Sequence, residues 1–258
     1  MLVVGSVLRV NAPSGCIPVV TSRGSFTAAA LDQSSGTVDG MGLCDIGDYI
    51  SSSITVSGLT VKDAIQYGIF VDSGSILPVP STGPITVPIS ATTVYNIGDH
   101  SGTMFTPSGA QHGIGIIYDS GTSGPVASGN ITLSYVHDYQ KGGIVINHNS
   151  NVATLNNTVK GLGPVPFIAQ NGIQYSRDAV GTIRGNTVSD NFYTGGTGIL
   201  ANGDPCGGMN PRCPPGRQYV SCGILLFAVD PNMIQRGQND VSNGNQRNFA
   251  IITDSALG

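Results

Sequence analysis

Residues 183–192 read IRGNTVSDNF, and weaker copies of the centre of this stretch recur along the chain. The copies are GLTVKD at 58–63, NNTVKG at 156–161 and GQNDVSNG at 237–244. Aligning the chain on the apolar residue at the centre of the motif gives a column of seven positions: Val38, Val61, Val94, Leu133, Val159, Val188 and Val241. The intervals run from 23 residues (61 − 38) to 53 residues (241 − 188). The sequence therefore predicts a repeat of roughly 20 to 30 residues with insertions.

A second column accompanies the first, since each unit then carries a Gly or another small residue before a short apolar run. The runs are YGIFVD from 67, GIGIIYD from 113, GGIVIN from 142, NGIQYS from 171, CGILLF from 222 and FAIITD from 249. A repeat of this length that is made of short strands, with no helical segment between them, is typical of a β-solenoid. Stacked turns of such a chain share one apolar interior.

The polar residues beside the apolar column are expected at the corners of the solenoid. Asn tolerates the left-handed backbone conformation that a sharp bend demands, and its amide can bond the Asn one turn along. Next to the apolar column we expect an outward-pointing stack of threonines: Thr60, Thr93, Thr132, Thr158 and Thr187.

The composition favours an all-β protein. The 258 residues include 37 Gly and 15 Pro, contain no Glu, and are only 10% charged. No window shows the 3.6-residue apolar stripe of an amphipathic helix. The net charge is −4 without a basic run, which argues against a nucleic-acid partner. No apolar stretch reaches the roughly 20 residues that a membrane-spanning helix needs.

The cysteines bear on the location of the protein. There are five, at Cys16, Cys44, Cys206, Cys213 and Cys222. In a weakly charged β chain rich in Asn and Thr, this usage favours an oxidising, extracellular or cell-surface location, with one thiol left over and the pairing open. We expect a single domain over 1–258. Because neither end carries a segment that would cover the last turn, we expect a truncated precursor or an unusual cap.

Four stretches resemble a known family: TVDGMG (37–42), LTVKDAIQYGIFV (59–71), GNITLSYVHDYQKGGIVI (129–146) and NGIQYSRDAVGTIRGNTVSDN (171–191). They look like repeats of right-handed parallel β-helix proteins of the pectate-lyase-like superfamily, and the likeness runs from about residue 34 to the C-terminus. The resemblance implies an all-β, right-handed parallel β-helix. It implies less about function, since this scaffold serves polysaccharide lyases, glycoside hydrolases and non-catalytic surface proteins alike. The paired-Asp, GHG and RIK set of polygalacturonases is absent.

The candidate catalytic residues form the densest polar group of the chain: Asp138, Lys141, His148, Arg177 and Asp178. His148 and Arg177 follow their strands at equivalent positions, so stacking about 4.8 Å apart brings them onto one face. A lyase needs a base that removes the proton α to a uronate carboxylate and a cation that neutralises that carboxylate. A hydrolase needs two carboxylic acids, for which Asp138 and Asp178 remain. The alternative is that Arg177 and Asp178 form a surface ion pair and His148 is a corner residue.

Substrate binding is assigned to tyrosines, because the chain has no Trp. Tyr139, Tyr175 and Tyr193 could stack against sugars. The largest insertion lies at about 195–222, where Arg217 could line one wall of a ligand groove.

Three acids end strands at the same place in their repeats, namely Asp72, Asp119 and Asp254. An Asx-turn explains each of them. The alternative is a calcium site, which needs two or three carboxylates on adjacent turns. We expect no cofactor, with calcium as the alternative.

The sequence leads to two functional hypotheses. The first is an extracytoplasmic β-helix that binds, and in a lyase- or hydrolase-like manner cleaves, a polysaccharide or cell-surface glycan in a lateral groove. The second is a non-catalytic surface, adhesion or structural repeat module. The substrate and the oligomeric state stay open.

Overall fold

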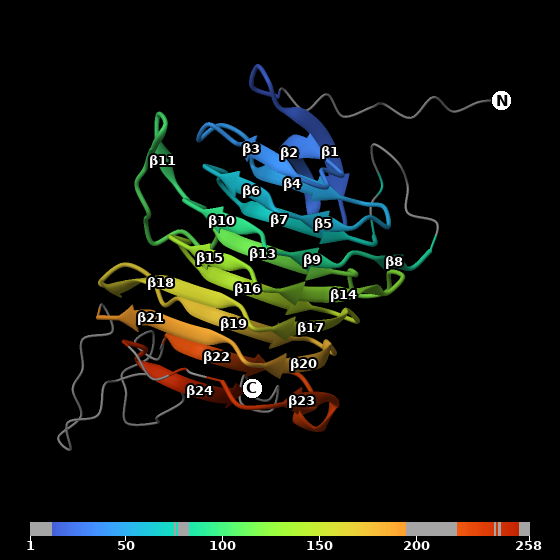
Figure 1. Cartoon of the computed structure of the whole chain (residues 1–258). Helices are drawn as coiled ribbons and strands as arrows, with labels where there is room; N and C mark the ends of the chain where they lie inside the picture. Colours follow the sequence, from blue (N-terminus) through green and yellow to red (C-terminus); the bar gives the residue numbers. More distant parts are fainter. Residues whose placement is uncertain are drawn as a thin grey trace.

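The computed structural model describes residues 12–74, 76, 83–194, 221–239, 241 and 244–252. This part of the chain is all-β and consists mainly of long parallel sheets (Figure 1). Helical structure in it is limited to one 3₁₀ turn, η1 (Pro231–Met233). Within the described ranges, no helix has the length and apolar character needed to cross a membrane.

Three sheets contain almost all of the strands. Sheet A has nine strands in the order β1 (Ile17–Thr21), β2 (Gly24–Leu31), β4 (Ile46–Ile50), β7 (Tyr67–Asp72), β13 (Ile114–Asp119), β16 (Gly142–Asn147), β19 (Asn171–Ser176), β22 (Cys222–Phe227) and β24 (Arg247–Ile252). Sheet B has six, in the order β3 (Gly36–Asp39), β6 (Leu59–Lys62), β10 (Thr93–Tyr95), β15 (Tyr135–His137), β18 (Thr158–Val165) and β21 (Thr187–Tyr193). Sheet C has seven, namely β5 (Val56–Ser57), β8 (Ile85–Thr86), β9 (Ile89–Ser90), β14 (Ala127–Thr132), β17 (Asn151–Leu155), β20 (Val180–Arg184) and β23 (Ile234–Arg236). A short antiparallel pair, β11 (His100–Ser101) and β12 (Met104–Phe105), stands apart.

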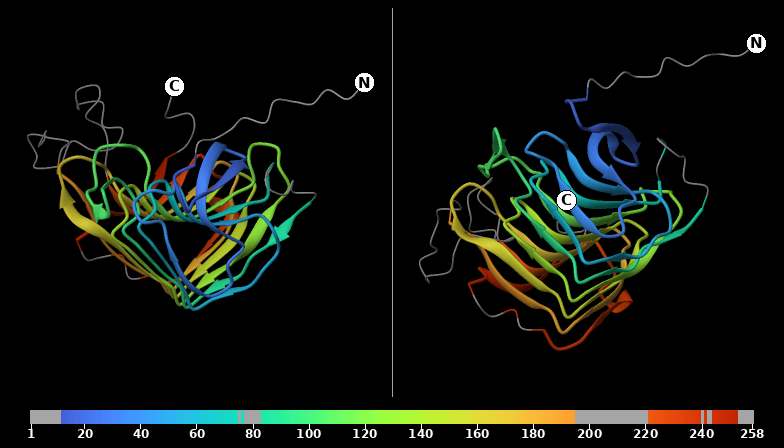
Figure 2. Two further views of the ribbon diagram at one scale, coloured as in Figure 1. Left: turned by 90° about the horizontal axis from the view of Figure 1, so that it is seen from above. Right: turned by 45° about the horizontal axis from the view of Figure 1, so that its top comes forward.

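The chain visits the three sheets in a fixed order. It passes from sheet B to sheet A to sheet C, as in β15, β16 and β17, and the next pass adds β18, β19 and β20 beside them. Viewed along the stack, successive passes overlie one another (Figure 2). All pairings in the three sheets are parallel except that of β1 with β2. This arrangement is compatible with the expected solenoid.

Of the seven positions predicted for the apolar column, all except Leu133 and Val241, which lie in no strand, belong to the inner row of sheet B. Its members pair one strand to the next and are at most 6% exposed: Val38, Val61, Val94, Val136, Val159 and Val188. Leu133 was the wrong member, because it lies in the turn after β14 with φ 52° and is 68% exposed. Val136 takes its place. Thr132 likewise belongs to sheet C, so Tyr135 replaces it in the threonine column.

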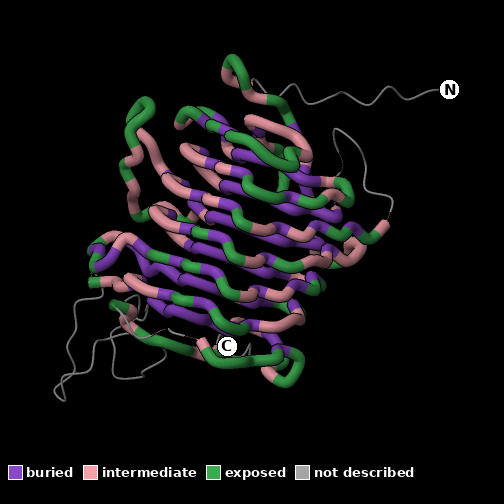
Figure 3. The backbone as a smooth tube through the Cα atoms, viewed as in Figure 1, coloured by how far each residue is buried: buried purple, intermediate pink, exposed green. Residues whose placement is uncertain are grey.

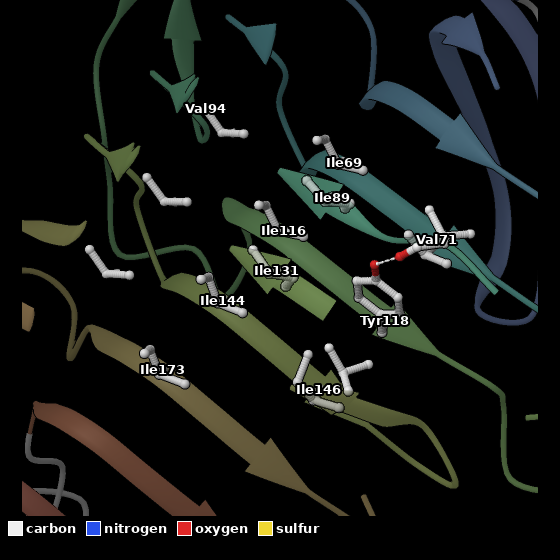
Figure 4. Packing of buried hydrophobic residues seen from close by; sticks show 14 of the residues in the cluster. Ile69, Val71, Ile89, Val94, Ile116, Tyr118, Ile131, Ile144, Ile146 and Ile173 are labelled. Atoms are coloured by element: carbon white, nitrogen blue, oxygen red, sulfur yellow. Dashed lines mark hydrogen bonds between the residues drawn. The ribbon is translucent and has the colours of Figure 1, made fainter. Parts of the chain in front are cut away.

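The apolar runs of the second column form sheet A. The runs from β7 to β22 each contribute two residues to the same core, such as Ile69 and Val71 from β7 or Ile144 and Ile146 from β16 (Figure 4). The last run, β24, does not, since its Phe249 and Ile251 are 36% and 43% exposed. The strands from β4 to β16 in this sheet are buried along nearly their whole length, whereas strands of sheet B such as β18 alternate between buried and exposed residues (buried residues are purple in Figure 3). Stacked passes therefore share one continuous interior.

The small residue that precedes these runs has a packing role. A methyl carbon at Gly143 would lie 2.4 Å from Cγ1 of Val159, and one at Gly172 would lie 2.3 Å from Cγ1 of Val188. Both distances are far below van der Waals contact, so sheet B can approach sheet A only where sheet A has no side chain.

Asparagines form a ladder at the corner between sheets C and B. The backbone N–H and the side-chain amide of Asn157 both donate to Oδ1 of Asn186 (3.0 and 2.9 Å), and those of Asn186 donate to Oδ1 of Asn239 (both 3.0 Å). The predicted bonding between turns is thus confirmed. The left-handed backbone, however, belongs to the preceding residue, Asn156 at φ 56° or Gly185 at φ 69°.

Asn186→Ala is expected to lower the free energy of unfolding by about 2–4 kcal/mol, because it leaves the buried amides of Asn157 without their acceptor. Denaturant unfolding measures this loss. Asn151→Ala is the matched control, since Asn151 is exposed on β17, and it should change stability by less than about 0.5 kcal/mol. Equal stability of the two variants would contradict a structural role for the ladder.

A hairpin made of β1 and β2 covers part of the outward face of sheet A. Val19 and Ala28 from the hairpin pack against Phe70 and Ile117 of sheet A in a second, smaller core. A disulfide between Cys16 and Cys44 ties the start of the hairpin to the turn before β4. Cys222 is buried and free, whereas Cys206 and Cys213 lie outside the described residues.

Candidate functional site

The corner that follows the sheet A strands gathers three of the predicted catalytic residues. His148 follows β16, and Arg177 and Asp178 follow β19; all three have left-handed backbone angles, with φ of 44°, 53° and 67°. Together with Thr122, Asn149 and Ala228 they line an open depression of about 560 Å³. We call this the corner depression. Because the two turns are equivalent in successive passes, the left-handed bends aim both sets of side chains at the same place.

A buried carboxylate, Asp119, lies behind His148. It ends β13 and is fully buried, and Nδ1 of His148 lies 2.7 Å from its Oδ1. Its oxygens also accept the amide of Asn147 (3.0 Å), the backbone N–H of Gly121 (2.7 Å) and Nε of Arg23 (2.5 Å). Burial alone would raise the pKa of Asp119, but the Arg23 charge and these hydrogen bonds outweigh burial and hold the pKa below its ordinary value.

Nδ1 of His148 has two polar neighbours, Oδ1 of Asp119 at 2.7 Å and the side-chain amide nitrogen of Asn147 at 2.9 Å. The ionised Asp119 can only accept, so the tautomer with the proton on Nδ1 fits this contact. In that neutral tautomer Nε2 keeps its lone pair, and within the described ranges no residue bonds it. The side chain of His148 is 16% exposed. A buried carboxylate that orients an imidazole with a free Nε2 is an arrangement suited to general acid–base catalysis.

Lys141 lies in a different place from His148. The two residues flank opposite ends of β16, a six-residue strand that spans roughly 20 Å. Nζ of Lys141 donates to the carbonyl of Ala169 (2.9 Å), and burial lowers the pKa of this lysine. It lines a separate pocket of about 260 Å³ with Phe167 and Tyr193. Lys141 and Tyr193 therefore do not belong to the corner depression.

Asp138 does not form a pair with Asp178. Asp138 follows β15 and lies 2.7 Å from Nδ1 of His137. It precedes β16, so it lies near the N-terminal ends of the sheet A strands, whereas the corner depression lies at their C-terminal ends. The carboxyl groups of a glycoside hydrolase lie about 5–9.5 Å apart, whereas a whole strand of roughly 20 Å separates these two. The two-carboxylate arrangement expected for a hydrolase is therefore absent at this pair.

Two of the predicted sugar-binding tyrosines are core residues. Tyr139 and Tyr175 are both fully buried. The hydroxyl of Tyr139 donates to Oδ1 of Asn191 (2.7 Å), and that of Tyr175 donates to the carbonyl of Val152 (2.7 Å). Neither ring faces solvent, so the prediction was wrong for both. Arg217 lies outside the described residues.

The strand-ending acids are confirmed as Asx-turns where they are described. Asp72 and Asp119 pair in register, and each Oδ1 accepts the backbone N–H two residues on, from Gly74 (2.9 Å) and Gly121 (2.7 Å). Asp254 lies outside the described residues. In the part of the chain that the structure describes, no group of three or more His, Cys or Asp residues could hold a metal ion.

The sequence analysis missed the contact of Asp119 with His148 and the ion pair of Asp119 with Arg23. It treated Asp119 only as a turn residue or a calcium ligand, although the match of Asp119 with Asn147 in the next run already placed it beside His148. Arg23 lies at the tip of the β1–β2 hairpin, in TSRGSF (21–26), where a Gly between two alternating runs signals a hairpin.

No protein-family model, no curated protein and no solved structure matches this chain.

Proposed function

We propose that the chain is a right-handed parallel β-helix that acts outside the cytoplasm on an acidic polysaccharide, by β-elimination at the corner depression. The observation that carries the proposal is the imidazole of His148, held by the buried Asp119 and beside Arg177 in one solvent-open depression. The cyclic order of the three parallel sheets supports the fold. The disulfide between Cys16 and Cys44 supports an oxidising location.

The proposed chemistry assigns one role to each side chain. Nε2 of His148 removes the proton on the carbon α to the uronate carboxylate. The electron pair left behind forms a carbon–carbon double bond, and the glycosidic oxygen departs and takes a proton from water. The guanidinium of Arg177 neutralises the carboxylate, on which negative charge develops as the proton leaves. Asp178 accepts hydrogen bonds from sugar hydroxyls.

Mixing the protein with a panel of polyuronates should produce the ultraviolet absorbance of the unsaturated product. Arg177→Ala is expected to lower kcat/KM by about 10²–10³-fold, because it removes the charge that stabilises the transition state. Lys141→Met is the matched control and should keep full activity, since Lys141 lies at the far end of the strand.

Two outcomes would contradict the proposal. If Lys141→Met loses activity and Arg177→Ala retains it, the reaction takes place at the other edge of sheet A. If no polyuronate yields absorbance but the protein still binds a glycan, the non-catalytic binding module is the better explanation.

A further inference from the structure

The outward face of sheet B carries two columns of side chains. One column is mostly threonine and pairs strand to strand in register: Thr37, Thr60, Thr93, Tyr135, Thr158 and Thr187. The other column, two residues further along each strand, contains charged and aromatic residues: Asp39, Lys62, Tyr95, His137, Lys160 and Ser189. Every member of both columns is exposed or partly exposed. We call this surface the sheet B face; it lies on the side of β3, β10 and β18 in Figure 1.

Three rings stack on one another at the centre of the sheet B face. The His137 ring lies 5.2 Å from that of Tyr95 with an interplanar angle of 3°, and 4.2 Å from that of Tyr135 with an angle of 25°. Tyr135 remains 40% exposed, while Tyr49 and Tyr118 are fully buried. The fold therefore places some tyrosines in its core and holds others rigidly in solvent. Rings that are already fixed lose little conformational entropy when a ligand binds.

Charged side chains surround the stack and are already paired. Nζ of Lys62 lies 2.5 Å from a carboxylate oxygen of Asp39 and 2.8 Å from one of Asp63. His137 bonds Asp138, and Lys160 lies 4.0 Å from Asp190. These pairs present fixed donors and acceptors on both sides of the rings.

The net negative charge of the sheet B face favours an uncharged ligand over an anionic one. Its four carboxylates (Asp39, Asp63, Asp138 and Asp190) outnumber its two ammonium groups (Lys62 and Lys160). The net charge stays negative whether or not His137 carries a proton. A polyuronate would be repelled from this surface, whereas an uncharged sugar can use the rings for apolar contact and the paired charges as hydrogen-bonding partners.

We propose that the sheet B face binds a neutral polysaccharide, with Tyr135 and Tyr95 as its aromatic contacts. This site is separate from the corner depression, which follows sheet A rather than sheet B. It would hold the protein on an uncharged matrix, independently of any reaction at His148.

The test is a depletion assay with insoluble cellulose, chitin and mixed β-glucans, using the whole chain. The double variant Tyr95→Ser, Tyr135→Thr carries residue types that other strands have at these positions, namely Ser189 and Thr158. It should therefore keep the wild-type melting temperature. We expect the wild-type protein to bind at least one of these polymers and the double variant to bind it about tenfold more weakly or worse.

Two controls make the outcome decisive. Leu133→Asn removes an exposed apolar side chain that lies in a turn outside the stack, and it should bind like the wild type. His148→Ala should also bind like the wild type, which separates this site from the proposed reaction. Unchanged binding by the double variant, binding to none of the neutral polymers, or preferential binding of a polyuronate that the double variant loses would each overturn the proposal.

Discussion

At pH 8, Asp48→Asn is expected to be about 4 kcal/mol more stable than the wild-type protein, whereas at pH 4 the two should differ little. Asp48 lies in β4, at the inward position where the next strand carries Ile69. Its side chain is fully buried; Oδ1 accepts the N–H of Gln33 (3.2 Å), and Oδ2 has no partner within the described ranges. Burial, with a smaller contribution from the charge of Asp32, raises the pKa of Asp48 from 3.8 to about 7.

The direction of this pH dependence follows from the different pKa of Asp48 in the folded and the unfolded chain. The unfolded chain loses the Asp48 proton near pH 3.8, but the folded chain keeps it until about pH 7. The stability that this retained proton contributes is complete below pH 3.8 and is lost as the pH rises through 7, at about 1.4 kcal/mol per pH unit. Asn has no proton to lose and can still accept from Gln33, so its advantage should grow across that window.

Denaturant unfolding at pH 4, 6 and 8 measures this advantage. Asp39→Asn is the control, because the Asp39 side chain is 40% exposed, and its effect should stay below about 1 kcal/mol at each pH. A stability difference for Asp48→Asn that is constant with pH would show that Asp48 does not ionise in this range.

Asp48 also shows where sequence reasoning about the fold stops. The repeats located sheet A almost strand by strand, because Gly followed by an apolar run recurs in YGIFVD, GIGIIYD and GGIVIN. IGDYI at 46–50 has the same Gly but a carboxyl group in the core, so its apolar pattern was too weak to be recognised. The error at Leu133 had a different cause: ITL carries the Thr and the apolar residue of the motif, whereas YVH, with Tyr in place of Thr, is the segment whose Val136 pairs with Val94 of β10.

The candidate site was predictable where it depended on the repeat. Equivalent positions after β16 and β19 had to lie together, and this brought His148 and Arg177 into one depression. Residues in the same stretch of sequence but on opposite ends of one strand, such as Lys141 and His148, were wrongly grouped, because closeness in sequence is not closeness across an extended strand. The hairpin that brings Arg23 to Asp119 lies outside the repeat, so the period carried no information about it.

His148→Ala is expected to lower kcat on a polyuronate by about 10²–10⁴-fold, because it removes the proposed base while leaving Arg177 and Asp178 in the corner depression. His148 also bonds the buried Asp119, so the variant is expected to lose some stability as well. Activity is therefore compared at a temperature well below the melting temperatures of both proteins. Full activity of His148→Ala would contradict the acid–base role.

Arg23→Gln provides the sharper comparison, because Arg23 bonds Asp119 without lining the depression. Removing its charge takes away an interaction that lowers the pKa of Asp119, so that pKa should rise. Asp119 must be ionised to hold the Nδ1 proton of His148, and the acid limb of the pH–rate profile should then move to higher pH while the plateau is retained. His148→Ala should lose the plateau itself. If Arg23→Gln left the acid limb where it is in the wild type, Asp119 would not be the group that prepares His148 for catalysis.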